Sequence, residues 1–409
     1  MALAPINPTE RIATLDVLRG LALYGVLTAN LTMFYSGLEF LPRGSFEPQP
    51  VAMFYLQMFV SSRAMTTLTF LFGIGFAVQL ARAEDRGHEV RDMFVRRLLV
   101  MLAFGIAHLV LLWWGDILWS YALTGFALLW FRRSSVRALL VWSIVLIFVP
   151  QLIFQLPFVR EAIGQVMPHP SSPPAFNAEL LSALGGDDRV AMTFAQLRHL
   201  VYFIGPILLW FLPWILGHFL LGMAAGKRRL FEQDGANHLR LFRWLLVIGL
   251  ALAVIGAAVM LVLRPTRATM MALPLAARIG LNMLRELVTL GVVAIYISGV
   301  VLLMQRRFPR RVLMLVAPVG RMPLTTYLSQ SVIATFIFYG WGLGWIGEVD
   351  LAGGLAISAG IFVVQVVIAH LWLRRYRSGP LEWLWRTLAY RHPRYDSADA
   401  RARPGRSAI

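Results

Sequence analysis

The chain contains no cysteine, and only 14% of its 409 residues are charged. Without cysteine it has no disulfide bonds, no zinc–thiolate site and no cysteine nucleophile. Soluble globular domains carry about 25% charged residues, so the low fraction argues against a soluble fold. Apolar residues make up 58% of the chain instead.

The sequence also lacks the short motifs of several enzyme classes. It has no GxxxxGK(S/T) phosphate loop, no HExxH metalloprotease motif and no GxSxG nucleophile elbow. Its eight histidines are scattered without the spacing that metal ligands need. We therefore expect no metal site.

Long apolar runs occupy most of the chain. A helix needs about 20 apolar residues to cross a bilayer core about 30 Å thick. We predict an all-α fold: one polytopic transmembrane domain over residues 1–390, with about ten helices and a long loop at about 157–198. The polar tail, 391–409, is predicted to be disordered. The expected spans are 13–34, 52–80, 98–114, 116–131, 136–156, 199–225, 241–263, 274–304, 312–338 and 351–373.

Lysine and arginine are unevenly distributed between the connecting segments. If the N-terminus is cytoplasmic, the cytoplasmic segments hold 27 of the 38 Lys and Arg residues, and the loops on the other side hold six. Positive charge collects on the cytoplasmic side of membrane proteins. We therefore expect both termini in the cytoplasm. The net charge of +17 then reflects orientation in a lipid membrane, and we expect no nucleic-acid partner.

Ionisable residues are costly inside a membrane and usually face a bundle interior or a cavity. His108 lies 11 residues beyond Arg97, about 16 Å along a helix and near the midplane. Asp116 begins the short arm after the turn, so it is expected in a recess below the surface. Tyr121 on the second arm and His108 on the first lie at about the same distance from the turn, so the two side chains could face each other. A histidine at this depth either exchanges a proton near neutral pH or is a neutral, structural residue.

Two further positions have both a structural and a functional interpretation. Asp16 and Arg19 share a helix face near the cytoplasmic end of the first span. They form either an intrahelical ion pair or a site where the guanidinium meets a phosphate. By residue count Arg321 lies about 14 Å inside the ninth span, either as a functional group or as the partner of a buried acid.

Other polar residues of the spans are candidates for substrate binding. Arg63 in the second span and Arg285 and Glu286 in the eighth are expected at the outer end of the membrane. There they form either an anion- or sugar-binding mouth or snorkelling side chains. Asn30 in the first span could instead join helices by hydrogen bonds. The candidates are Asn30, Arg63, Arg285, Glu286, Tyr327 and Gln330.

Five segments follow one another along the chain: RIATLDVLRGLALYGVLTANL, TLTFLFGIGFA, RRLLVMLAFGIAHLVLLWWGDILWSYAL, GRMPLTTYLSQS and SGPLEWLWR. In this order they resemble segments of the bacterial YeiB-like membrane proteins, over nearly the whole chain. The YeiB-like group resembles a branch of the transmembrane acyltransferases. Other branches are the lysosomal heparan glucosaminide N-acetyltransferases and the acyltransferase-three proteins, which O-acetylate surface polysaccharides.

The resemblance implies an acyltransferase of the bacterial inner membrane. Such an enzyme takes an acyl group, most often acetyl, from acyl-CoA in the cytoplasm and passes it to an acceptor hydroxyl or amine on the other side. Its membrane histidine matches His108 in GIAHLV. Asp16 and Arg19 match the DxxRG opening of the glucosaminide acetyltransferases.

These observations combine into a catalytic hypothesis. His108 acts as general base or accepts the acyl group itself, and Arg321 stabilises the oxyanion. Asp116 and Tyr121 shape the acceptor side, while Arg19 contacts the phosphates of CoA. A homodimer is compatible with the sequence. Two alternatives remain: a proton-coupled secondary transporter of a small solute, and a non-catalytic component of an envelope assembly.

Overall fold

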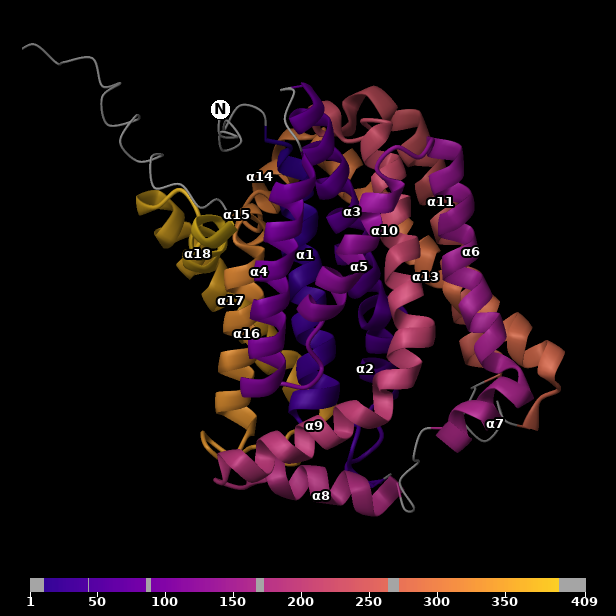
Figure 1. The fold of residues 1–409 in the computed structure, drawn as a ribbon, viewed down its shortest axis with the longest axis vertical. Coiled ribbons are helices and arrows are strands. Elements are labelled where there is room, and N and C mark those ends of the chain that lie inside the picture. Colours follow the sequence, from indigo (N-terminus) through magenta and orange to yellow (C-terminus); the bar gives the residue numbers. More distant parts are fainter. Residues whose placement is uncertain (1–10, 43, 86–89, 167–172, 264–271, 390–409) are drawn as a thin grey trace, which may run out of the picture.

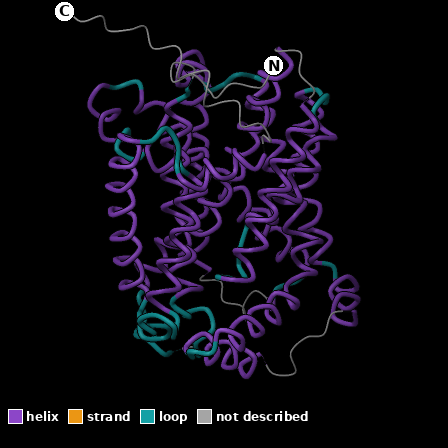
Figure 2. Tube along the Cα trace, turned by 60° about the vertical axis from the view of Figure 1, so that its left-hand side comes forward, coloured by secondary structure: helices purple, strands orange, loops and turns teal. Residues whose placement is uncertain are grey.

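The computed structural model describes residues 11–42, 44–85, 90–166, 173–263 and 272–389. Over these ranges the regular secondary structure is helical and includes no strand, so the all-α prediction is confirmed. Most helices run up and down the bundle (Figure 1), and the turned view shows the same arrangement (Figure 2). The start of α1 and α18 share one end of the bundle, here called the basic end, and α8 and α9 lie across the opposite end.

Within the described residues, eight helices are long and apolar enough to cross a membrane, so the chain is a multi-pass membrane protein. Several of these membrane-length helices contain a π-helical or 3-10 helical turn. The eight are Ala13–Tyr35 (α1 Ala13–Asn30 and η2 Leu31–Tyr35), Pro50–Ala81 (α2 Pro50–Tyr55, η3 Leu56–Val60 and most of α3 Ser61–Asp85), Arg91–Leu111 (in α4 Val90–Leu111), α6 Val136–Gln155, Ile207–Lys227 (η4 Ile207–Phe211 and α10 Leu212–Lys227), Glu232–Leu263 (η5 Glu232–His238 and α11 Leu239–Leu263), α13 Leu275–Met304 and α17 Leu351–Arg375.

Two of the ten expected spans differ from a full crossing helix. The span expected at 116–131 is α5 (Leu118–Phe131), whose 14 residues extend about 21 Å. The span expected at 312–338 is broken into three helices, because a proline lacks the N–H that a continuous helix needs and so tends to begin a new one. The three are α14 (Arg307–Leu313), α15 (Ala317–Arg321) and α16 (Pro323–Phe338).

The segment at 157–198 was expected to be an irregular loop, and this prediction was wrong. It contains α7 (Pro157–Val166), α8 (Pro173–Gly185) and the first half of α9 (Arg189–Pro206). Of the residues that suggested a loop, Pro173 begins α8 and Gly185 ends it, positions where proline and glycine favour a start and a stop. The sixth span consequently begins at Ile207 rather than at residue 199. The tail expected at 391–409 lies outside the described residues.

Glycines allow the central helices to pack closely. A Cβ atom on Gly222 of α10 would lie 1.9 Å from the Phe70 carbonyl oxygen of α3, and one on Gly73 would lie 2.0 Å from the Phe219 carbonyl oxygen. Without a hydrophobic effect between helices in lipid, such small-residue contacts provide much of the packing energy. At the basic end, Gly320 of α15 makes a similar close approach to the backbone of α1.

Candidate functional site

The hairpin of α4 and α5 places two polar side chains face to face. His108 lies in the last turn of α4, and Asp116 lies two residues before α5. Gly105 lets the two arms approach, since a Cβ atom there would lie 2.3 Å from the backbone nitrogen of Trp119. The Trp119 N–H donates to Asp116 Oδ2 at 3.0 Å, so the carboxylate also satisfies an N–H of the first turn of α5.

His108 and Asp116 form a buried dyad. His108 Nδ1 lies 2.7 Å from Asp116 Oδ1, and the two residues are only 3% and 4% exposed. An ionised carboxylate can only accept, so we assign the proton of a neutral imidazole to Nδ1 and the lone pair to Nε2. Among the described residues Nε2 has no hydrogen-bond partner, although it is buried. An oriented histidine with an unpaired Nε2 has the geometry of a general base or nucleophile.

Tyr327 of α16, not Tyr121, contacts this dyad. Its hydroxyl donates to Asp116 Oδ1 at 3.3 Å, and its ring centroid lies 5.4 Å from that of His108. The hydroxyl of Tyr121 instead pairs with Thr69 of α3 at 2.6 Å. The predicted pairing of His108 with Tyr121 is therefore corrected. Of the predicted residues, His108, Asp116 and Tyr327 come together in one site.

A group of aromatic residues with buried polar atoms extends into the bundle from the hairpin loop. Trp113 packs on Tyr35 with 4.7 Å between ring centroids, and the Tyr35 hydroxyl donates to Ser331 Oγ at 2.8 Å. Tyr339 lies beside Tyr35, at 6.2 Å. The Trp113 Nε1 and the Tyr339 hydroxyl are buried without a partner among the described residues. Sequence analysis missed this group because isolated aromatic residues in apolar helices carry no distinctive signal.

Two predicted substrate residues have other surroundings. The Gln330 amide donates to Gln365 Oε1 of α17 at 3.0 Å, and Gln365 donates to Ser329 Oγ at 2.8 Å. These bonds join α16 to α17, as polar residues between membrane helices commonly do. Asn30 is the last residue of α1 and is half-buried. Neither residue is in hydrogen-bond contact with the dyad in the structure.

At the basic end, arginines surround one buried carboxylate. Arg19 Nη1 donates to Asp16 Oδ1 at 2.8 Å, and Arg11 Nε lies 3.2 Å from Oδ2. Arg321 interacts electrostatically with Asp16 and Arg11. It was predicted to act beside His108, but the break before Pro323 ends α15 against the first turn of α1. The cluster has three guanidinium groups for one carboxylate, which favours an anion.

The predicted mouth around Glu286 is instead a buried cluster. Glu286 Oε1 accepts a hydrogen bond from Trp214 Nε1 at 3.1 Å, and Oε2 accepts one from Gln151 Nε2 at 3.2 Å. Arg63 is 6% exposed, so neither residue snorkels to an interface, whereas Arg285 is exposed. His218 Nε2 lies 3.6 Å from Glu286 Oε1, and sequence analysis had not selected it.

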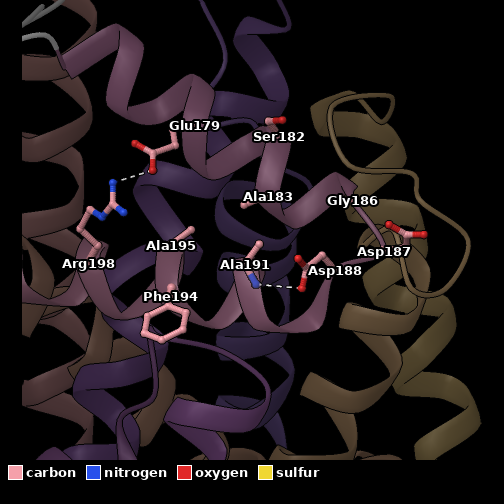
Figure 3. A pocket seen from close by; sticks show the side chains of 10 residues that line it. All are labelled: Glu179, Ser182, Ala183, Gly186, Asp187, Asp188, Ala191, Phe194, Ala195 and Arg198. Carbon is pink, nitrogen blue, oxygen red and sulfur yellow. Dashed lines mark hydrogen bonds and ion pairs between the residues drawn. The ribbon is translucent and has the colours of Figure 1, made fainter.

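The helices α8 and α9 line an open cavity of about 450 Å³, which Figure 3 shows from close by. Most of its charged lining already has a structural partner. Glu179 pairs with Arg198 at 2.6 Å, and Asp188 accepts hydrogen bonds from the N–H groups of Val190 and Ala191 at the start of α9. The cavity lacks the dyad residues and we assign no chemistry to it.

The same helix pair covers the hairpin loop. The Trp114 N–H donates to Gln196 Oε1 of α9 at 3.0 Å. The His199 ring stacks on Phe176 of α8 at 5.0 Å between centroids and lies 4.5 Å from Trp114. Access to the dyad from this end of the bundle therefore depends on α9.

The covering helix is expected to loosen in acid. Burial lowers the pKa of His199 to about 4, below the value of about 6.5 for an exposed histidine. The neutral, buried His199 therefore contributes to the stability of the folded α9. This contribution is complete above a pH of about 6.5 and is lost as the pH falls towards about 4, because His199 of the unfolded helix binds a proton more readily. Amide hydrogen exchange in α9 should accelerate over this interval. In His199→Phe, which keeps an aromatic ring, the acceleration should be much smaller; an equal acceleration would contradict the assignment.

Comparison with known proteins finds bacterial relatives over nearly the full chain. A family model described as "Protein of unknown function (DUF418)" matches residues 225–392. "Uncharacterized protein YxaH" of Bacillus subtilis is 34% identical over 406 residues, covering 95% of this chain and 96% of the relative. "Uncharacterized protein YeiB" of Escherichia coli is 27% identical over 402 residues, covering 93% and 97%. No solved structure matches significantly.

Proposed function

The chain belongs to the YeiB-like family, and we propose that it is an acyltransferase embedded in the bacterial inner membrane. In this proposal an acyl group, most often acetyl, passes from cytoplasmic acyl-CoA to a hydroxyl or amine of an acceptor that enters from the other side. The observation that carries the proposal is the His108–Asp116 dyad. It is buried, and its imidazole has one nitrogen held by a carboxylate and the other without a hydrogen-bond partner in the described part of the chain.

The dyad supports a simple acyl transfer. His108 Nε2 takes the proton of the acceptor hydroxyl or amine as that group attacks the thioester carbonyl. The new C–O or C–N bond forms, the C–S bond breaks, and the departing CoA thiolate takes the proton back from the imidazolium. Asp116 keeps the proton-accepting tautomer and stabilises the imidazolium. Tyr327 donates to the same carboxylate and so fixes its position.

The basic end is the proposed donor side. Arg11, Arg19 and Arg321 surround Asp16, and the side chains of Arg11 and Arg19 are 37% and 27% exposed. Guanidinium groups bind phosphate oxygens in charge-assisted hydrogen bonds, so these residues would hold the phosphates of CoA. With both termini in the cytoplasm, this end faces the acyl-CoA pool.

Arg19→Ala should weaken acetyl-CoA binding by roughly 10- to 100-fold, since a hydrogen bond to a charged group contributes about 1.5–3 kcal/mol. Calorimetry on the purified protein in detergent measures the affinity. Arg198→Ala is the matched control, because Arg198 is an exposed arginine paired with Glu179 at the opposite end. Unchanged binding in Arg19→Ala would move the CoA site elsewhere. No binding of any acyl-CoA by a folded protein would argue against the enzyme.

A proton-coupled secondary transporter is the second candidate. It is favoured by Glu286 and His218, which meet inside the bundle at 3.6 Å. Ionisable pairs in membrane helices often form proton relays in transporters. A transporter would move its solute across vesicles without consuming acyl-CoA, which distinguishes the two functions.

A further inference from the structure

Within the bundle His218 meets Glu286, and Arg63 interacts electrostatically with that acid, in a cluster that the proposed acyl transfer does not use. Arg63 comes from α3, His218 from α10 and Glu286 from α13. Their exposed fractions are 6%, 0% and 9%. Buried ionisable groups are expensive in a membrane and usually have a function.

The hydrogen bond of His218 to the backbone determines which nitrogen faces the acid. Nδ1 lies 2.8 Å from the Trp214 carbonyl oxygen. A carbonyl only accepts, so Nδ1 carries a proton and a neutral imidazole has its lone pair on Nε2. Nε2 lies 3.6 Å from Glu286 Oε1. If Glu286 were ionised beside a neutral His218, two lone pairs would face each other in a medium of low dielectric constant.

One proton between the two groups removes this conflict. On Nε2 it makes an imidazolium–carboxylate pair at 3.6 Å, and on Oε1 it makes a carboxylic acid whose O–H faces the imidazole. Glu286 interacts electrostatically with Arg63 on α3, and Arg63 interacts in turn with Arg285 and Tyr296 on α13. Without the extra proton Glu286 balances the charge of Arg63, and with it the three-residue cluster carries one positive charge.

The two helices that supply Arg63 and His218 are both irregular next to the cluster. The π-helical turn η3 ends at Val60, directly before α3, and η4 ends at Phe211, directly before α10. The Tyr296 hydroxyl donates to the Phe59 carbonyl oxygen within η3. Single π-helical turns inside membrane-length helices occur frequently at functional sites, and interrupted helices build ion sites in transporters.

We propose that His218 and Glu286 form a proton-binding site inside the bundle, separate from His108, which holds one proton between Nε2 and Oε1 near neutral pH. The assignment does not depend on the acyltransferase activity. It identifies a place where the protein takes up and releases a proton within the membrane-spanning helices.

Spectroscopy on the full-length protein counts this proton. Nitrogen NMR of isotope-labelled histidine reports whether His218 is an imidazolium, and His218→Gln identifies its signals. Infrared spectroscopy reports the carbonyl band of a protonated Glu286. The wild-type protein should show one of these two signals near pH of about 7. His370 is the internal control, since its Nδ1 also bonds a backbone carbonyl, that of Val366, and no described carboxylate forms an ion pair with it.

Glu286→Gln should remove whichever of the two signals the wild-type protein shows, the His218 imidazolium or the protonated Glu286. It should leave His218 neutral with its proton on Nδ1. The amide can donate to Nε2 in place of the acid, so the contact is kept. A wild-type spectrum with neutral His218 and no protonated Glu286 would overturn the proposal even if the variant failed to fold. That result would leave the role of His108 untouched, because Glu286 does not contact the dyad.

Discussion

Replacing His108 with alanine is expected to lower the rate of acyl transfer by roughly 10²–10⁴-fold, the range that general acid–base catalysis contributes. Alanine removes the only nitrogen that the dyad offers to an acceptor, while the CoA site at the basic end stays intact. The loss should therefore appear in kcat rather than in acetyl-CoA affinity. The assay follows a radiolabelled acetyl group from acetyl-CoA into a bacterial envelope extract, which does not require the acceptor to be known.

Asp116→Asn tests the second half of the dyad. An asparagine oxygen can still accept from Nδ1, but it carries no charge to stabilise the imidazolium, so a large part of the rate should be lost. The control is His370→Ala, a histidine change on α17 away from the hairpin. A rate for His108→Ala equal to that of the wild-type protein, with the fold intact, would exclude the proposed role.

Gly222→Ala is expected to lower the thermal stability of the protein strongly. The new methyl group would lie 1.9 Å from the Phe70 carbonyl oxygen, which is backbone and can move away only by separating α3 from α10. Overpacking of a well-packed interior costs about 1–3 kcal/mol, and this contact lies at the centre of the bundle. The unfolding temperature of the purified protein in detergent measures the effect.

Gly75→Ala is the matched control for this crossing. Gly75 lies on α3, two residues from Gly73, but no described atom beyond its own stretch of helix lies within 4 Å of the position of an added Cβ. Its replacement should leave the unfolding temperature unchanged or slightly raised, because alanine favours a helix by about 1 kcal/mol over glycine. An equal loss of stability in both variants would show that the close crossing is not the cause.

The fold class and the hairpin were predictable because they depend on local composition. Long apolar runs predict membrane helices, and the short second arm after Gly115 corresponds to α5, which has 14 residues. The three-part structure of 307–338 was not predicted. One helix was expected over 312–338, and Pro323 instead begins a new one. Depths counted along one straight helix consequently failed for Arg321.

The candidate site was predictable in part. His108 and Asp116 stand out because they are polar residues in an apolar hairpin, and they are only eight positions apart. Their contact with Tyr327 joins residues more than 200 positions apart and depends on which helix packs against the hairpin. His218 satisfied the same rule of an ionisable residue inside a span. It was overlooked because its partner, Glu286, lies on a helix that no local pattern connects to it.

The most direct test of the central claim is transfer of the labelled acetyl group by the wild-type protein in sealed vesicles, with His108→Ala as the comparison. Acetyl-CoA is supplied to one side at a time, and the envelope extract to the other. Transfer is expected only when acetyl-CoA is on the side that exposes Arg11 and Arg19, and the variant should show background levels. A folded wild-type protein that transfers no label from either side, or a variant as active as the wild type, would contradict it.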